Sequence, residues 1–146
     1  MPHYVADKVG EALNTHRKAV NGSSILILGI TYKKDIDDIR ESPALDVMHV
    51  LQQRGAEVAY ADPHAPALSA RDWPGKSEMA AVDVTRAELA KYDCVVILTD
   101  HKAFDYSLIV EGSKLVFDTR NALGSDAGAH VYRLGAPQRL PVNTAV

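Results

Sequence analysis

The chain has 146 residues, a length that suits one domain with a core of its own. Its formal net charge of -3 gives no bulk attraction to nucleic acid or to an anionic membrane surface. The apolar runs are too short to cross a bilayer, nothing at the start resembles a signal peptide, and a single cysteine excludes an internal disulfide. These features predict a cytoplasmic protein that binds neither nucleic acid nor membrane.

The first third of the chain predicts a helix followed by a β-loop-α-β unit. Apolar residues recur at helical spacing from Tyr4 to Val20. The continuous apolar run Ile25–Leu28 is typical of a strand buried on both faces. Ser42–Pro43 suit a helix N-cap and first helical position, and Gly55 closes that helix before a second strand at Val58–Ala61.

The rest of the chain continues the alternation of strands and helices. Residues 63–79 are rich in Pro, Ala and Gly and are expected to form a surface connection. The further expected elements are a short strand at 82–84, a brief helix at 85–91, a strand at 93–98, a weakly helical stretch at 104–111, and strands at 114–117 and 130–134. The pattern predicts an α/β fold, a Rossmann-like open parallel sheet with helices on both faces, preceded by an N-terminal helix.

Charged residues crowd the loop between the first strand and its helix. Seven of the ten residues from Tyr32 to Glu41 are charged, at a strand end where α/β folds place ligands. An NAD fingerprint would need G-x-G-x-x-G, but Gly29 stands alone, so a self-contained NAD site is rejected. Lys33 and Arg40 can instead bind phosphate or carboxylate with their side chains. A solvated ion-pair network is an equally weighted alternative.

A second polar cluster, Asp118-Thr119-Arg120-Asn121, follows a later strand. It lies on the same rim of the predicted sheet as the charged loop, so Arg120 and Lys33 can converge on one anion. The alternative is a turn held by Asp118 and Asn121, with Arg120 in solvent.

Three other residues have structural interpretations. Asp62 ends the second strand, where a ribose-binding acid would lie, but the following proline favours turn capping. His101 is expected to make a structural hydrogen bond rather than to contact a ligand. Cys94, flanked by strand residues, is expected to be a small buried hydrophobe and not a nucleophile. The histidines show no paired ligand spacing, so no metal site is predicted.

The charged loop also carries a family resemblance. GITYKKDIDDIRESPALDV resembles the signature of the C-terminal domain of UDP-glucose/GDP-mannose dehydrogenases, roughly G-x-x-Y/F-K-x-x-x-x-D-x-R-E-S-P. RGAEVAYADP, YDCVVILTDHKAF and VFDTRNAL agree in the same order, and MPHYVADKVGEALN resembles the end of the family's central helical region. The resemblance implies that residues 1–21 end the helical region and that residues 22–134 form the UDP-sugar-binding domain. Two prolines and the lack of a pattern favour disorder in the tail, 135–146.

The resemblance implies a role in a nucleotide-sugar 6-dehydrogenase of polysaccharide biosynthesis. Such enzymes oxidise a sugar C6 alcohol to a carboxylate with NAD, through covalent intermediates on a catalytic cysteine. This sequence contains neither the NAD fingerprint nor the stretch around that cysteine, so the chain by itself is expected to be inactive. NAD would be held mainly by an N-terminal domain. The implied partners are a UDP-sugar, the NAD-binding and helical domains of the parent chain, and a second subunit in a homodimer.

Site residues carry over by their positions in the matched motifs. Tyr32 and Lys33 correspond to residues that contact the UDP-sugar, and Arg120 corresponds to a further substrate contact. Arg40 corresponds to a residue that reaches toward NAD. The segment KKDIDDIRESPAL most resembles the corresponding sequence of family members that act on UDP-N-acetylhexosamines, such as UDP-N-acetylglucosamine 6-dehydrogenase. The alternative is a non-catalytic α/β regulatory or protein-interaction domain, whose charged loop would be a partner surface.

Overall fold

A computed structural model describes residues 2–31, 42–69, 78–123 and 128–134 of the chain. Its elements, in chain order, are α1 (Pro2–Thr15), β1 (Ser24–Leu28), α2 (Pro43–Gln53), β2 (Glu57–Ala61), β3 (Ala67–Leu68), β4 (Met79–Ala80), α3 (Arg86–Leu89), β5 (Cys94–Ile97), α4 (Tyr106–Gly112), β6 (Val116–Asp118) and β7 (Val131–Arg133). The predicted tail, 135–146, lies outside the described residues. No described helix has the length and apolar character that a membrane span requires.

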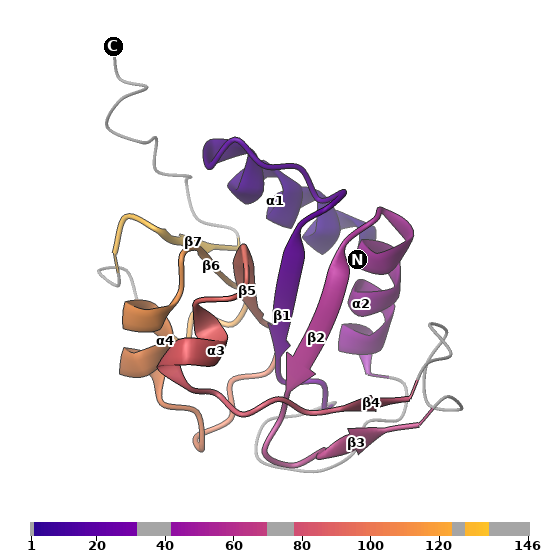
Figure 1. Cartoon of the computed structure of the whole chain (residues 1–146), viewed down its shortest axis with the longest axis vertical. Helices are drawn as coiled ribbons and strands as arrows, with labels where there is room; N and C mark the ends of the chain where they lie inside the picture. The colour runs from indigo at the N-terminus through magenta and orange to yellow at the C-terminus, as the bar shows by residue number, and fades with distance from the viewer. Residues whose placement is uncertain (1, 32–41, 70–77, 124–127, 135–146) are drawn as a thin grey trace.

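Five strands form one parallel sheet in the order β2-β1-β5-β6-β7 (Figure 1). β1 is an interior strand, next to the edge strand β2 on one side and to β5 on the other. The strand order changes direction between β1 and β5, which is the point where open α/β sheets bind their ligands. The predicted Rossmann-like sheet is therefore confirmed.

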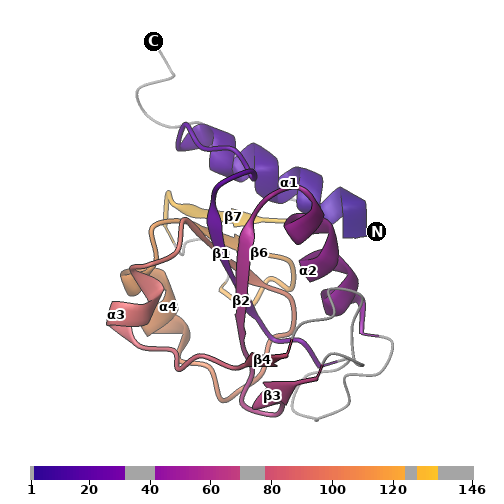
Figure 2. The same cartoon turned by 45° about the vertical axis from the view of Figure 1, so that its right-hand side comes forward.

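Two apolar layers bury the two faces of the sheet. Helices α1 and α2 lie on one face, and α3 and α4 lie on the other (Figure 2). The run Ile25–Leu28 serves both layers because successive strand residues point to opposite faces. Ile25 and Ile27 belong to the α1–α2 layer, whereas Leu26 and Leu28 belong to the α3–α4 layer. All four side chains are fully buried, which explains why the run is continuously apolar.

Helix α1 ends earlier than the predicted boundary at Val20. Arg17 adopts a left-handed conformation with φ 60°, and the N–H of Lys18 donates to the carbonyl of Leu13 over 3.1 Å. The N–H of Arg17 donates to Asn14 in the same turn. This is a Schellman-type ending without the usual glycine, so helical spacing alone overestimated the length of α1.

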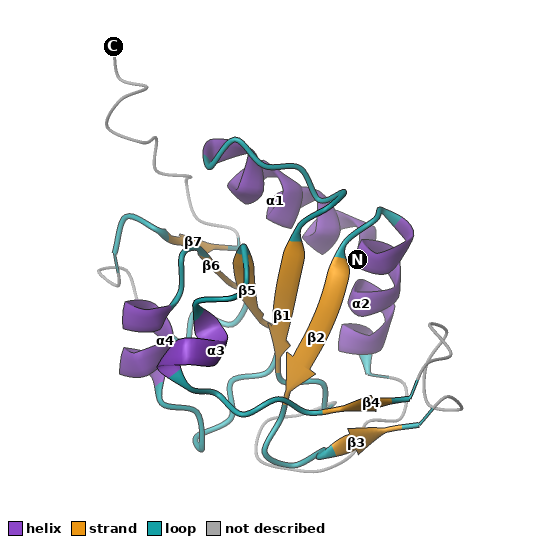
Figure 3. Ribbon diagram, viewed as in Figure 1, coloured by secondary structure: helices purple, strands orange, loops and turns teal. Residues whose placement is uncertain are grey.

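The connection after β2 differs from its prediction. No strand forms at 82–84; instead β4 pairs antiparallel with β3 below the carboxyl ends of the sheet (Figure 3). The N–H of Val82 donates to the carbonyl of Tyr60, which ties this stretch to β2. Leu68 is buried in the α1–α2 layer. The described part of 63–79 is therefore in part packed structure and not merely a surface connection.

Cys94 lies in β5 with no exposed surface. Burial, assisted by the negative charge of Asp93, raises the pKa of the Cys94 thiol above its usual range. The prediction of a small buried hydrophobe is confirmed.

At Gly29 the chain that leaves β1 passes against Thr99, in the segment that follows β5. Gly29 has φ +86°, and a Cβ built on it would lie 2.5 Å from the backbone oxygen of Thr99. Gly22 has the same φ, but a Cβ there would meet nothing within 4 Å. The two glycines therefore share a backbone constraint, and only Gly29, which is also buried, makes a close approach to another part of the chain.

We predict that Gly29→Ala lowers the free energy of unfolding about 1–3 kcal/mol more than Gly22→Ala does, because only the first variant adds a clash to the left-handed strain. Urea unfolding of both variants measures the difference. If both variants lost the same free energy of unfolding, the close approach of Gly29 to Thr99 would not restrict the residue at position 29.

We also predict that the Cys94 thiol of the folded chain resists a thiol reagent at pH 8 and reacts fully in denaturant, because the thiolate is the reactive form and burial disfavours it. The denatured chain is the internal control. Prompt stoichiometric labelling of the native chain would contradict the buried placement of Cys94.

Candidate functional site

A pocket of about 270 Å³ opens at the carboxyl edge of the sheet. The loops after β1, β5 and β6 and the first turn of α2 contribute to it, and α1 closes one side. The described residues that line it are Pro2, Val5, Thr31, Ser42, Pro43, Ala44, Val47, Leu98, Thr99, Thr119, Arg120 and Leu134. The pocket thus lies at the strand-order reversal, where the topology favours a ligand.

The amino end of α2 forms one wall of this pocket. Ser42 has the extended conformation of an N-cap, and its hydroxyl accepts a hydrogen bond from the N–H of Ala44 over 3.3 Å. Pro43 occupies the first helical position, as predicted. The positive end of the helix dipole therefore faces the pocket, which favours a negatively charged ligand.

Arg120 lies on another wall, on a turn that Asp118 builds. The buried Asp118 carboxylate accepts hydrogen bonds from the N–H groups of Arg120 and Leu123, each over 2.9 Å. Asn121 takes a left-handed φ of 56° in the same turn, and its side-chain oxygen accepts from Arg133. The turn predicted as the alternative does form, and it also brings Arg120 to the pocket.

The Arg120 side chain is 49% exposed. Its Nε lies 3.5 Å from Oδ1 of Asp100, which follows β5. Among the described residues this is the one ion pair of Arg120, and a guanidinium presents five N–H donors in a planar fork. The geometry leaves the fork suited to a phosphate or carboxylate group.

Asp62 has a larger role than the predicted turn cap. Its Oδ1 accepts from the N–H of His64 over 2.7 Å, which confirms the cap. Its Oδ2 also accepts from the N–H groups of Ile30 and Thr31, over 2.7 and 3.1 Å. The carboxylate at the end of β2 therefore holds the loop after β1. Sequence reasoning missed this contact, although both groups were expected at the same edge of the sheet.

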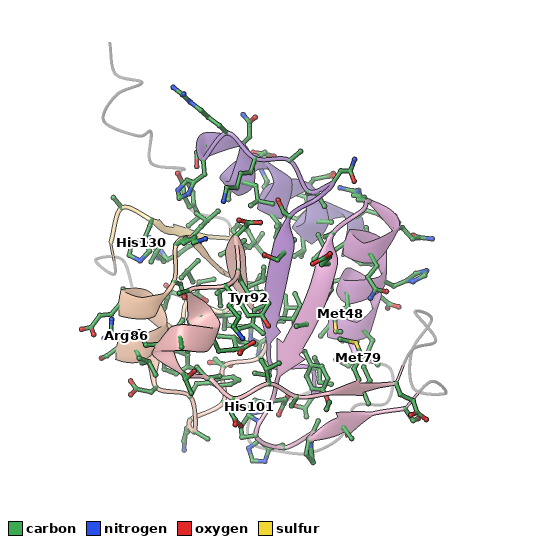
Figure 4. All side chains as sticks on the ribbon, viewed as in Figure 1. Met48, Met79, Arg86, Tyr92, His101 and His130 are labelled. Atoms are coloured by element: carbon green, nitrogen blue, oxygen red, sulfur yellow. The ribbon has the colours of Figure 1, made fainter. Side chains whose placement is uncertain are left out.

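His101 completes the same buried cluster. Its Nε2 lies 2.8 Å from the hydroxyl of Thr31 and 3.1 Å from Oδ2 of Asp62. The side chains of His101 and Asp62 have no exposed surface. Figure 4 shows His101 close to the ends of the β1 and β2 arrows, at the same edge of the sheet as the pocket. The predicted structural hydrogen bond is confirmed.

Tyr32, Lys33 and Arg40 lie outside the described residues. The expected convergence of Lys33 and Arg120 on one anion therefore stays a prediction. Thr31, which immediately precedes Tyr32, lines the pocket, as does Ser42, two positions after Arg40. Within the described stretches, no three His, Cys, Asp or Glu side chains are arranged to hold a metal ion.

Comparison with known proteins gives a family match over residues 26–125, to the model of the UDP-glucose/GDP-mannose dehydrogenase family, UDP binding domain. The UDP-N-acetyl-D-mannosamine dehydrogenase of Methanococcus maripaludis is 36% identical, over 92% of this chain and 32% of its own length. The NDP-N-acetyl-D-galactosaminuronic acid dehydrogenase of Ralstonia solanacearum is 34% identical, over 82% of this chain and 26% of its own.

A solved structure shares the fold. The UDP-D-ManNAc dehydrogenase of Pyrococcus horikoshii superimposes with a TM-score of 0.72 at 25% identity, over 92% of this chain and 30% of that one. The chain thus spans at most about a third of the length of these relatives. The family match covers the charged-loop signature, most of β1, all of β2, β5 and β6, and the Arg120 turn. The chain belongs to the UDP-glucose/GDP-mannose dehydrogenase family and corresponds to its UDP binding domain.

Proposed function

We propose that this chain forms the UDP-sugar site of a nucleotide-sugar 6-dehydrogenase, whose parent enzyme oxidises the C6 alcohol of a UDP-sugar to a uronic acid with NAD. The observation that carries the proposal is the position of Arg120. Arg120 lines a pocket at the strand-order reversal of a domain whose family binds UDP.

The chemistry of the pocket suits a diphosphate. The chain has a net charge of -3, so a local group must supply the attraction. Arg120 supplies a permanent positive charge, and the first turn of α2 supplies oriented N–H dipoles. Pro2, Val5 and Leu134 add apolar surface beside these groups, as a nucleotide base or sugar ring would require.

The proposal assigns roles to three residues of the charged loop. Tyr32 and Lys33, which follow Thr31 in the chain, would contact the UDP-sugar. Arg40 would reach toward NAD, which the NAD-binding domain of the parent enzyme would hold. The family motif supports these assignments, since all three residues stand at its matched positions.

We propose a UDP-N-acetylhexosamine as the substrate of the parent enzyme. The names of the two relatives described above refer to UDP-N-acetyl-D-mannosamine and to an NDP-linked N-acetyl-D-galactosaminuronic acid, and both of these sugars carry an N-acetyl group. The NAD-binding and helical domains of the parent enzyme would supply the remaining walls of the site. Residues 1–21 would end that helical region, and the whole enzyme would be a homodimer.

We predict that the chain binds UDP in a calorimetric titration and that Arg120→Ala weakens binding about tenfold or more. A hydrogen bond to a charged group contributes about 1.5–3 kcal/mol, and about 1.4 kcal/mol corresponds to a factor of ten. Lys33→Ala is expected to weaken binding in the same direction.

The matched control is Arg86→Ala, which removes a guanidinium from an exposed pair with Glu111 on the α3–α4 side of the sheet. It should leave the affinity for UDP unchanged. A wild-type chain that bound UDP no better than Arg120→Ala would contradict the proposed site.

A further inference from the structure

We propose that His101 is a positioning residue for the UDP pocket, acting through Thr31 and Asp62 without touching the ligand. The inference rests on the proposed function, because the pocket wall that His101 holds is the wall assigned to UDP. Its basis is a buried cluster that joins the loops after β1, β2 and β5.

Thr31 is held through its N–H, its carbonyl and its hydroxyl. Its N–H donates to Oδ2 of Asp62 over 3.1 Å, and its carbonyl accepts from the Thr99 hydroxyl over 2.9 Å. Its own hydroxyl lies 2.8 Å from Nε2 of His101. Thr31 is 1% exposed as a residue and still lines the pocket. Asp62, Thr99 and His101 therefore all help to hold Thr31 at the pocket.

The carboxylate of Asp62 favours a proton on Nε2 of the His101 ring. Oδ2 faces the N–H groups of Ile30 and Thr31 as well as Nε2 of His101. A carboxylate oxygen accepts hydrogen bonds. The contact of 3.1 Å between Nε2 and Oδ2 is therefore a hydrogen bond when Nε2 carries a proton. Nε2–H therefore points toward two acceptors, the Asp62 carboxylate and the Thr31 hydroxyl oxygen, and links them.

The surroundings of His101 hold the ring in this orientation. Its backbone carbonyl accepts from the Tyr106 hydroxyl over 2.7 Å. Its ring centroid lies 4.6 Å from that of His64 and 5.7 Å from that of Phe104. His101 is fully buried and is not among the described residues that line the pocket. An effect of His101 on ligand binding must therefore pass through the groups that it holds.

Two substitutions separate the hydrogen bond from packing. His101→Leu replaces the ring by an apolar side chain of similar volume and removes the donor. His101→Gln replaces the ring by an amide whose N–H₂ can reach the position of Nε2. The test measures two quantities on each variant of the 146-residue chain: the affinity for UDP, and the hydrogen exchange of the Ile30 and Thr31 amides, with the Val95 amide of the central sheet as reference.

His101→Leu is expected to lower the affinity for UDP by on the order of tenfold and to speed exchange at Ile30 and Thr31 relative to Val95. His101→Gln is expected to recover most of the affinity for UDP and most of the protection of Ile30 and Thr31 from exchange. Wild-type affinity in His101→Leu would overturn the proposal. So would equal losses in the two variants, since packing alone would then explain the effect.

The two measurements keep this proposal distinct from the proposed function. A wild-type chain that fails to bind UDP contradicts the proposed function and removes the pocket role of His101. The exchange rates then still decide whether His101 holds Thr31. Unchanged exchange at Ile30 and Thr31 in His101→Leu would reject the positioning contact itself.

Discussion

The carboxylate of Asp62 is the interaction on which the ligand edge of this domain depends. β1 is buried on both faces, so the chain that leaves it carries backbone N–H groups into the interior, where each needs a partner. Asp62, at the end of the neighbouring strand, accepts from the N–H groups of Ile30 and Thr31. Gly29 makes this path possible because its backbone passes against Thr99 with no room for a side chain. The pocket is built outward from this fixed turn.

This turn also explains how a Rossmann-like sheet can bind a nucleotide without a dinucleotide fingerprint. A glycine-rich loop lets the backbone approach a pyrophosphate directly. Here the backbone N–H groups of Ile30 and Thr31 are already used by Asp62, so attraction for a diphosphate must come from elsewhere. In the proposed site, Arg120 and the amino end of α2 would supply it from two other elements. A guanidinium and the amino end of a helix would thus take the place of the glycine-rich loop.

Local signals predicted most of the fold. The Ile25–Leu28 run and the cap at Ser42 were readable because burial pattern and capping chemistry act over a few residues. The end of α1 could not be predicted from the sequence, because a left-handed Arg17 occupies the position where a glycine is usual. The contact between Asp62 and His101 joins residues 39 positions apart in the sequence, and a local sequence pattern cannot predict such a contact. The ligand contacts in the charged loop rest on the family motif.

The central claim is that UDP binds at the carboxyl edge beside Arg120. The most direct measurement is the crystal structure of the chain with UDP. The account predicts the diphosphate within hydrogen-bond distance of the Arg120 guanidinium, beside the first turn of α2 and the chain at Thr31. UDP bound at any other face, or bound here without contact to Arg120, would contradict it.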